Sequence, residues 1–432
     1  MTTRMNCRTL VTLGLVAALL LTSCSPPTTR AAEVAESKLD RVSSPDVSAT
    51  DIEQLVRGNN AFAWELYQAW RDDGGNLFYS PYSISVALAM TYAGARGETE
   101  QQMRETLNFL LSNERLHPAF NSLDQELNSL AESGREHEKE PFQLNIANSI
   151  WGQSGYKWLP EFLDLLAENY GAGLRLTDFV KNPEAARQAI NNWVSEKTND
   201  RIEDLIAKGL IDPTTRLVLA NAIYFKAAWQ HQFDESRTED TTFYLVDGKE
   251  VTVPMMAMAT TGQLLYASGD GYQAVELPYQ GGRVAMTIVV PDAGRYRQFE
   301  DDLSAERMEA IVGGLEYQAV AVRLPKFEYE SNCRMAQTLA EMGMPDAFRE
   351  QADLSGMDGT KDLFISEVVH KAFVAVDEVG TEAAAATAVM IALAAMPTTP
   401  VQLTIDRPFV FAIRDVKTGS TLFVGRVLDP TS

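Results

Sequence analysis

The segment DEVGTEAAAATAVMIALAAMPTTP, residues 377–400, constrains the fold of this chain more than any other part of the sequence. It holds four consecutive alanines, Ala383 to Ala386, and has no charged side chain from Ala383 to Met396. Such a run can form a buried helix, enter a membrane or change conformation. It is too short to span a bilayer, which takes about 20 apolar residues. Alanine favours helix, so a buried helix and a segment that changes conformation both stay open on the residues alone.

The N-terminus has the pattern of an export signal. Arg4 and Arg8 precede the short apolar stretch TLVTLGLVAALLL, which is followed by LTSC, ending at Cys24. A basic start and a short apolar core are typical of a secretory signal. LTSC also resembles the lipobox of bacterial lipoproteins, in which the cysteine receives a diacylglycerol and the chain is cut just before it. An ordinary signal peptide, with Cys24 incidental, is the alternative.

We therefore predict three parts along the chain. Residues 1–23 are a lipoprotein signal peptide, residues 24–50 are the lipidated cysteine and a flexible tether rich in Ser, Pro, Thr and Ala, and residues 51–432 form the folded domain. The protein is expected to be exported and anchored to a bacterial membrane, extracytoplasmically or at the cell surface. Because Cys333 would be the remaining free thiol, the core has to hold the fold without disulfides.

The overall composition excludes some partners. The 432 residues allow one large domain or two to three small ones, and 45% hydrophobic residues is normal for a globular protein. The net charge of −22 is spread along the chain. Since phosphates would be repelled, we expect no binding of nucleic acid.

Helical patterns come first in the folded part and strand patterns follow. Phe62, Leu66 and Trp70 lie at fourfold spacing, and Ser80-Pro81 is a typical helix start before a nearly all-apolar run. RLVLANAIYFKAAW predicts one long strand, AVELPYQGGRVAMTIVVP predicts two strands around a Gly-Gly turn, and DVKTGS predicts a turn between two paired strands near the C-terminus. This order indicates an α+β fold with a large, mainly antiparallel sheet system.

Patterns of catalysis and metal binding are missing from the sequence. The four histidines form no HExxH pattern, and GxSxG, GxGxxG and GxxxxGK[ST] motifs do not occur. Cys333 has no local signature of a nucleophile. His370 lies in a strand-like run and needs a hydrogen-bond partner once buried. We expect no enzyme, no metal site and no cofactor; a catalytic triad assembled from distant residues is the remaining enzymatic alternative.

Two C-terminal segments, VVHKAFVAVDEVGTEAAAATAV and DRPFVFAIRDVKTGSTLFVGRVLDP, closely resemble the serpin family of protease inhibitors. Other segments match in the family's order: NLFYSPYSISVALAMTYAGARGET, TRLVLANAIYFKAAWQHQF, AVELPYQGGRVAMTIVVPD and RLPKFEYE. The resemblance covers residues 51–432. It implies a serpin fold of three β-sheets and eight to nine helices, an exposed reactive-centre loop and a monomer.

The resemblance also implies a mechanism. In serpins the loop is bait for a serine protease, or for a papain-like cysteine protease, which cuts it and forms an acyl-enzyme. The cut loop then inserts as a new strand of the main sheet, and the distorted protease is trapped. A non-inhibitory serpin, serving as a binding protein or chaperone, is the alternative. Such members usually carry bulky, charged or proline residues in the hinge, and the residues from Gly380 to Ala386 include none of these apart from the single charge of Glu382.

The resemblance assigns roles residue by residue. The hinge comprises Glu378, Gly380, Thr381, Glu382, Ala383, Ala384, Ala385 and Ala386. The polar shutter beneath the central strands comprises Ser80, Ser83, Asn221 and His370, and the breach at the top of the sheet is marked by Trp229. The family's spacing from the hinge places the reactive bond at Ala394–Ala395, although the following segment is longer than usual and leaves the two adjacent bonds as alternatives. Small residues here suit an elastase-like or subtilisin-like protease.

The hinge residues fit insertion physically. In an extended strand, alternate side chains face opposite sides, which puts Thr381, Ala383 and Ala385 on one side. Those residues are small and could enter a packed sheet, whereas the charge of Glu382 falls on the other side and can stay solvated. No proline interrupts the run from Gly380 to Met396, so every amide can join the ladder.

Overall fold

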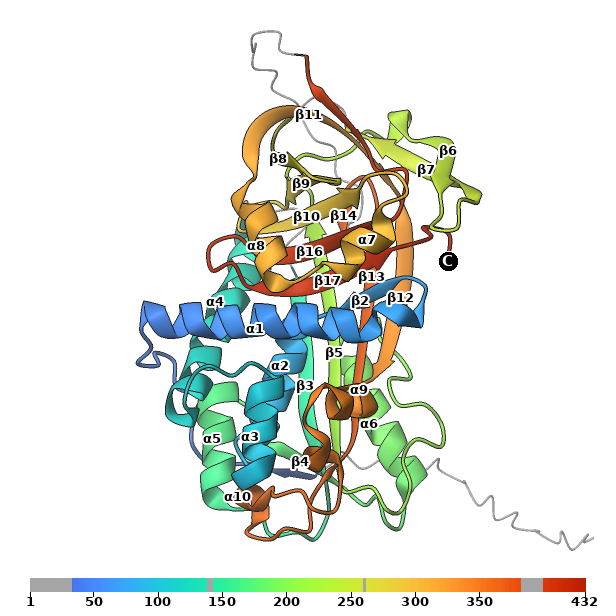
Figure 1. Ribbon diagram of the computed structural model, residues 1–432. Coiled ribbons are helices and arrows are strands. Elements are labelled where there is room, and N and C mark those ends of the chain that lie inside the picture. Colours follow the sequence, from blue (N-terminus) through green and yellow to red (C-terminus); the bar gives the residue numbers. More distant parts are fainter. Residues whose placement is uncertain (1–32, 138–142, 259–261, 382–398) are drawn as a thin grey trace, which may run out of the picture. The chain divides into compact units, whose positions relative to one another are not determined.

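The computed structural model describes residues 33–137, 143–258, 262–381 and 399–432 (Figure 1). The α-helices are α1 (Ala49–Trp70), α2 (Pro81–Tyr92), α3 (Gly97–Thr106), α4 (Asn113–His137), α5 (Pro160–Tyr170), α6 (Pro183–Lys197), α7 (Tyr296–Asp301), α8 (Ala305–Gly313), α9 (Ala336–Met342) and α10 (Ser355–Asp358). Short 3-10 helices lie at Arg71–Asp73, Glu235–Arg237 and Pro345–Phe348. None of the helices in the described ranges is long and apolar enough to cross a membrane.

The strands form two hydrogen-bonded sheets within the described ranges. Sheet A has the order β1 (Glu33–Ala35), β4 (Leu174–Thr177), β3 (Gln143–Gln153), β5 (Leu217–Ala228), β14 (Gly380–Thr381), β13 (Ile365–Val376), β12 (Phe327–Arg334). The second sheet has the order β2 (Leu77–Tyr79), β17 (Thr421–Val427), β16 (Phe409–Asp415), β10 (Val284–Pro291), β9 (Tyr272–Pro278), β8 (Gly262–Gly269), β11 (Glu316–Pro325), β7 (Glu250–Ala257), β6 (Glu239–Tyr244), with β15 (Val401–Thr404) beside β11.

The α+β class is confirmed, but the numbers of helices and sheets differ from the expected eight to nine helices and three sheets. Ten α-helices are present in the described residues, among them α7, α9 and α10 with six, seven and four residues. Two of the three expected sheets are joined into one because β11 runs through both. Its first half pairs with β8, and its second half pairs with β7 and β15.

Local sequence signals account for the helices that support sheet A. Ser48 caps α1 through a capping box with Asp51, and Ser80 caps α2 with Pro81 at its first position, as predicted. Every residue of α2 is buried, because this helix packs against β3 and β5. On the opposite face α6 contributes Ala186, Ile190 and Val194 to a separate small core over β3, β5 and β13.

The long strands of sheet A run side by side in Figure 1. The run RLVLANAIYFKAAW forms β5, as predicted, with β3 antiparallel on one side and β13 parallel on the other. Beyond the pair Phe373–Tyr224, the strands β5 and β13 separate, and β14 lies between their upper ends. This separation is the feature that positions the candidate site.

The segment expected to be a flexible tether is partly docked, which corrects the predicted boundary at residue 51. β1 pairs antiparallel with β4 at the edge of sheet A. Ser37 donates to Asp164 of α5 (2.5 Å), and Arg41 forms an ion pair with Asp124 of α4 (2.7 Å). Composition predicted a free tether because this segment has few apolar residues, but backbone pairing and charge-assisted contacts hold it instead.

Candidate functional site

The hinge turn, residues 377–381, ends in a strand that is already part of sheet A. Gly380 and Thr381 pair antiparallel with Ala228 and Ala227 of β5, and Thr381 also pairs with Val376 of β13. The side chain of Thr381 is fully buried. The upper gap between the central strands is therefore filled by the first residues of the segment that was singled out in the sequence.

Gly380 is required by a close backbone approach. A Cβ atom added at this position would lie 2.1 Å from the carbonyl oxygen of Ala227 and 2.7 Å from the Cα of Ala228. Both are backbone atoms that cannot rotate away. Any other residue would therefore force β14 away from β5, so the role of this glycine is steric fit.

The carboxylate of Asp377 closes the turn. It accepts hydrogen bonds from the amides of Val379 (2.9 Å) and Gly380 (3.0 Å), and its own amide donates to the carbonyl of Gly380 (3.0 Å). Burial raises the pKa of Asp377, and the two amide hydrogen bonds oppose this rise. Sequence reasoning missed this residue, although Asp followed by Gly three positions later is a usual turn signal.

Glu378 is fixed from two sides. One carboxylate oxygen forms an ion pair with Lys326 (2.6 Å), and the other accepts from the hydroxyl of Thr238 (2.6 Å). Burial acts to raise the pKa of Glu378, but the hydrogen bonds from Lys326 and Thr238 outweigh it, and the pKa is lowered. The carbonyl of Glu378 also accepts from the amide of Phe233 (2.9 Å). The predicted hinge glutamate thus ties the turn to two other segments, the β5–β6 connection and the β11–β12 junction.

Trp229 lies directly against the hinge turn, at the end of β5. Its amide donates to the carbonyl of Val379 (2.7 Å) and its indole Nε1 donates to the carbonyl of Asp377 (3.0 Å). Its ring stacks on Tyr279 with centroids 4.5 Å apart, and the hydroxyl of Tyr279 lies 2.7 Å from Oγ1 of Thr381. The residue expected at the top of the sheet is therefore in contact with the hinge, and Tyr279 joins it.

The four predicted shutter residues form one polar cluster below the hinge, with Asn148 as a fifth member. The backbone amide of Ser80 donates to Nε2 of His370 (3.2 Å), so His370 carries its proton on Nδ1 and donates it to Oδ1 of Asn221. Asn221 donates to Oγ of Ser83 (2.7 Å) and to Oδ1 of Asn148. Burial lowers the pKa of His370 to about 3, so the imidazole is neutral at physiological pH.

The polar cluster connects β3, β5 and β13, and β5 and β13 are the strands that would separate if the segment after β14 entered sheet A. His370, Asn221 and Asn148 are register partners on β13, β5 and β3. The contact between His370 and Asn221 therefore crosses the junction of β5 and β13, just below the place where β14 parts them. Asn148 was missed in the sequence, where it is one of two asparagines in the strand run QLNIANSIWGQ.

Several predicted residues lie outside the described ranges: Glu382, Ala383, Ala384, Ala385 and Ala386 of the hinge, Ala394 and Ala395 of the reactive bond, and Cys24.

Cys333 faces His370 across the β12–β13 pair, and burial raises its pKa to about 12, so it is a protonated thiol. No group of three potential metal-ligating side chains occurs in the part of the chain that the structure describes.

Comparison with known proteins agrees with this geometry. The sequence model of the family described as Serpin (serine protease inhibitor) matches residues 57–430. The chain belongs to the serpin family. This serpin is 40% identical to bovine leukocyte elastase inhibitor over 388 residues, which covers 88% of this chain and all of the relative.

Further relatives extend beyond animals. An uncharacterized serpin-like protein of Thermococcus kodakarensis is 40% identical over 378 residues, covering 87% of this chain and 86% of the relative. The native-state crystal structure of the thermophilic serpin tengpin superposes with a TM-score of 0.79 at 30% identity, covering 92% of this chain and all of tengpin. The serpin fold is therefore shown for this chain.

Proposed function

We propose that this serpin is a suicide-type inhibitor of serine proteases. A protease would cut the segment 382–398, form an acyl-enzyme through its serine, and be trapped when the cut segment inserts between β5 and β13. The observation that carries the proposal is the pairing of Gly380 and Thr381 with these two strands. Insertion would continue this existing pairing and would part β5 from β13 where they now pair directly, between Ile365 and Phe373.

The residues after Thr381 suit such a continuation. Thr381 is fully buried and faces the core, so Ala383 and Ala385 would follow it on the same side of an extended strand. About ten further strand residues would add on the order of a dozen hydrogen bonds at ~0.5–1.5 kcal/mol each. A gain of about 10 kcal/mol is comparable with the stability of a whole domain, so the intact form would be metastable and kept by a barrier.

The side chains at the expected reactive bond indicate which class of protease would be inhibited. The expected reactive bond Ala394–Ala395 has small side chains on both sides, which fits an elastase-like or subtilisin-like protease. The bovine relative is named as an inhibitor of leukocyte elastase, which supports the same choice. The mechanism needs no cofactor and no catalytic step by the serpin itself. A non-inhibitory role as a binding protein or chaperone is the alternative.

A gel with two arginine variants tests the mechanism. Wild type mixed with an elastase should give a covalent complex that survives boiling in detergent, since an acyl bond survives it. Thr381→Arg places a charge in a fully buried position, so insertion should slow and the serpin should be cleaved with little complex. Glu382→Arg, which would fall on the opposite side of an extended strand, is the matched control and should keep most of the complex.

The outcomes separate the two functions. If Thr381→Arg traps elastase as well as wild type does, insertion is not the mechanism. If neither serine nor papain-like cysteine proteases form a complex with wild type, the non-inhibitory alternative holds. Sedimentation of the wild type should give a monomer.

We also propose that the protein is exported and carries a diacylglycerol on Cys24. Labelled palmitate should enter the wild type expressed in a bacterial host and should not enter Cys24→Ser. Equal labelling of both proteins would overturn this proposal without touching the inhibitory one.

A further inference from the structure

A second candidate site lies apart from the hinge and the polar cluster. It is a hollow of about 400 Å³ where three connections meet: the β6–β7 turn, the segment from β10 to α7, and the segment from β15 to β16. This volume falls within the roughly 300–1,000 Å³ of typical small-molecule sites. None of its lining residues belongs to the hinge turn or the polar cluster.

The lining of the hollow is mainly apolar. Pro291, Tyr296 and Pro408 line it and are buried. Tyr244 and Val246 line it from the β6–β7 turn and keep 46% and 37% of their surface exposed. A large apolar surface left open in this way is unusual unless something covers it.

The walls of the hollow are held in place before any ligand arrives. The amide of Tyr244 donates to the carbonyl of Asp406 (2.8 Å), which ties the β6–β7 turn to the segment before β16. The amide of Leu245 donates to the carbonyl of Lys249 (2.8 Å), which closes the turn itself. A preformed site loses less conformational entropy when a ligand binds.

Arg407 lines the hollow with a partly buried guanidinium that is ion-paired with the adjacent Asp406. Its Nε donates to Asp406 (2.8 Å), and its side chain is 27% exposed. In the described residues Asp406 is its one protein acceptor, so the terminal N–H groups of the guanidinium are available. Arg297 on the rim is instead engaged with Glu300 (3.1 Å), and Asp292 is exposed to solvent, where charge is well screened. The half-buried Arg407 is therefore the group that selects a ligand.

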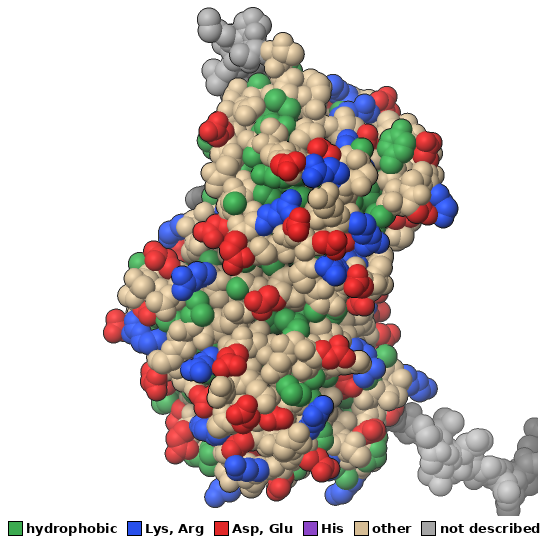
Figure 2. Space-filling view, in the orientation of Figure 1, with side chains coloured by type: hydrophobic (Ala, Val, Ile, Leu, Met, Phe, Trp, Pro, Cys, Tyr) green, Lys and Arg blue, Asp and Glu red, His purple; other side chains and the backbone are tan. Residues whose placement is uncertain are grey.

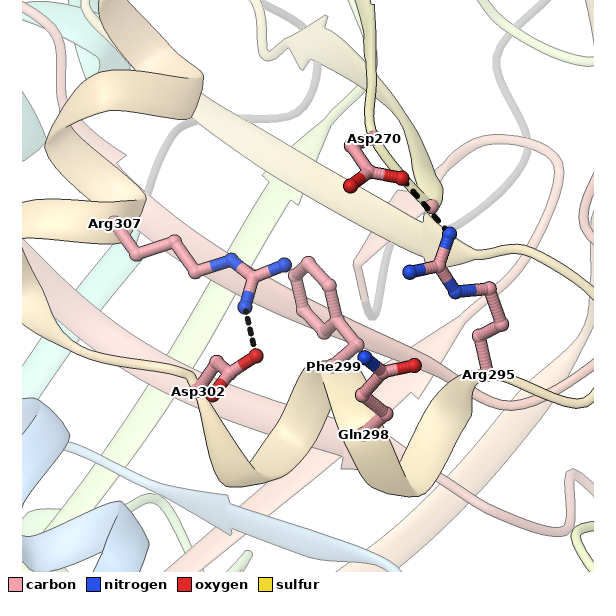
Figure 3. Close-up of a pocket in the computed structure, with 7 residues that line it drawn as sticks. Asp270, Arg295, Gln298, Phe299, Asp302 and Arg307 are labelled. Carbon is pink, nitrogen blue, oxygen red and sulfur yellow. Dashed lines mark hydrogen bonds and ion pairs between the residues drawn. The ribbon is translucent and has the colours of Figure 1, made fainter.

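Another hollow on the same molecule lacks these properties. It measures about 90 Å³ and lies between the β8–β9 turn, α7 and α8 (Figure 3). Arg295 is paired with Asp270 (2.9 Å), and Arg307 is paired with Asp302 (3.3 Å) and stacks over Phe299. Its volume lies well below that of typical small-molecule sites, so it carries no proposal.

We propose that the 400 Å³ hollow binds a small apolar molecule that carries one carboxylate. The apolar body would cover Tyr244, Leu245 and Val246, and the carboxylate would accept hydrogen bonds from the terminal nitrogens of Arg407, as guanidinium and carboxylate pair in a planar fork. This proposal is independent of protease inhibition, because the hollow shares no residue with the hinge.

Displacement of a fluorescent probe tests the site. Anilinonaphthalene sulfonate, an apolar anion, should brighten on the wild-type protein, and decanoate should displace it at least about threefold more tightly than decanol. Leu245→Glu places an anion within the apolar wall and should abolish the signal. Tyr317→Ala, which removes a 74%-exposed aromatic side chain outside the hollow, should leave the signal unchanged.

A matched pair of arginine variants tests the charge. Arg407→Gln should weaken decanoate about tenfold and leave decanol within about twofold, whereas Arg297→Gln should change neither by more than about twofold. A probe signal that survives Leu245→Glu would overturn the site. Equal effects of the two arginine variants, or equal affinity for decanoate and decanol, would overturn the assigned ligand class. Unchanged melting temperatures of the variants should accompany the expected results.

Discussion

The hydroxyl of Tyr279 lies 2.7 Å from the hydroxyl of Thr381, and both side chains are fully buried. Tyr279 also stacks on Trp229, whose indole donates to the hinge turn. Thr381 is therefore held in sheet A by side chains as well as by its strand partners, and each of these contacts can be removed separately by substitution.

Tyr279→Phe should loosen the hinge without creating a cavity. It removes one buried hydrogen bond, and the loss should lower the free energy that holds β14 in the sheet by about 0.5–1.5 kcal/mol. Hydrogen exchange at the amide of Thr381 should become up to about tenfold faster. Tyr266→Phe, which removes a hydroxyl bonded to Gln273 elsewhere, is the control and should not change this exchange rate.

Gly380→Ala should expel β14 from the sheet, because the new methyl group would meet the backbone of Ala227 and Ala228. The amides of both β14 residues should lose most of their protection from hydrogen exchange. Gly313→Ala provides a matched control in α8, where nothing lies within 4 Å of the added Cβ; it should be neutral or stabilising by up to about 1 kcal/mol. Retained protection in Gly380→Ala would show that the strands can yield.

His370 predicts a loss of stability in acid. Its pKa is lowered by burial to about 3 in the folded protein, against 6.5 for the free side chain. The unfolded chain therefore binds the extra proton, and stability falls as the pH drops from about 6.5 towards 3, by up to about 1.4 kcal/mol per pH unit.

Burial also lowers the pKa of His117, to about 4, so His117 adds to the same acid limb. Urea titrations across this pH range should show that the free energy of unfolding falls less steeply with decreasing pH in His370→Gln than in wild type. His231→Gln, which changes an exposed residue, should retain the wild-type slope. An unchanged slope in His370→Gln would contradict the neutral, buried state of this histidine.

Arg41→Ala should destabilise the domain by releasing the N-terminal segment. Arg41 donates to Asn121 and pairs with Asp124, and both contacts are partly buried, so we expect a loss of about 1–3 kcal/mol. Arg57→Ala, in the adjoining helix α1, is the comparison and should cost little. A melting temperature equal to wild type in Arg41→Ala would mean that β1 and the Ser37–Asp164 hydrogen bond hold the segment without Arg41.

Long, strongly patterned elements could be predicted from the sequence. Local sequence patterns predict the apolar helix α2 after Ser80-Pro81, the strand β5 and the strand pair β16–β17. Cross-strand partners could not be predicted. Asn148, Lys326 and Tyr279 reach the site through register and sheet order, and neither is fixed by local sequence. The strand β14 has only two residues, so no periodicity marks it.

The site residues split in the same way. Ser80, Ser83, Asn221 and His370 were found through family resemblance, and the structure brings them together. Composition could not show that a polar segment such as residues 33–42 docks, because the contacts that hold it are made by backbone pairing and by single charged side chains. Acidic and basic side chains are interspersed on the face in Figure 2, in line with the spread of charge along the sequence.

Because β1 is docked on sheet A, a lipid on Cys24 would limit how far β1 can lie from the membrane. If Cys24 carries a lipid, eight residues separate it from Glu33, the first residue of β1. At about 3.5 Å per residue, such a linker reaches at most roughly 30 Å, whereas a free tether to α1 would reach about three times as far. Lipid anchoring would then keep the β1 edge of this serpin close to the membrane, and the protein could not diffuse away from that membrane to reach a distant protease.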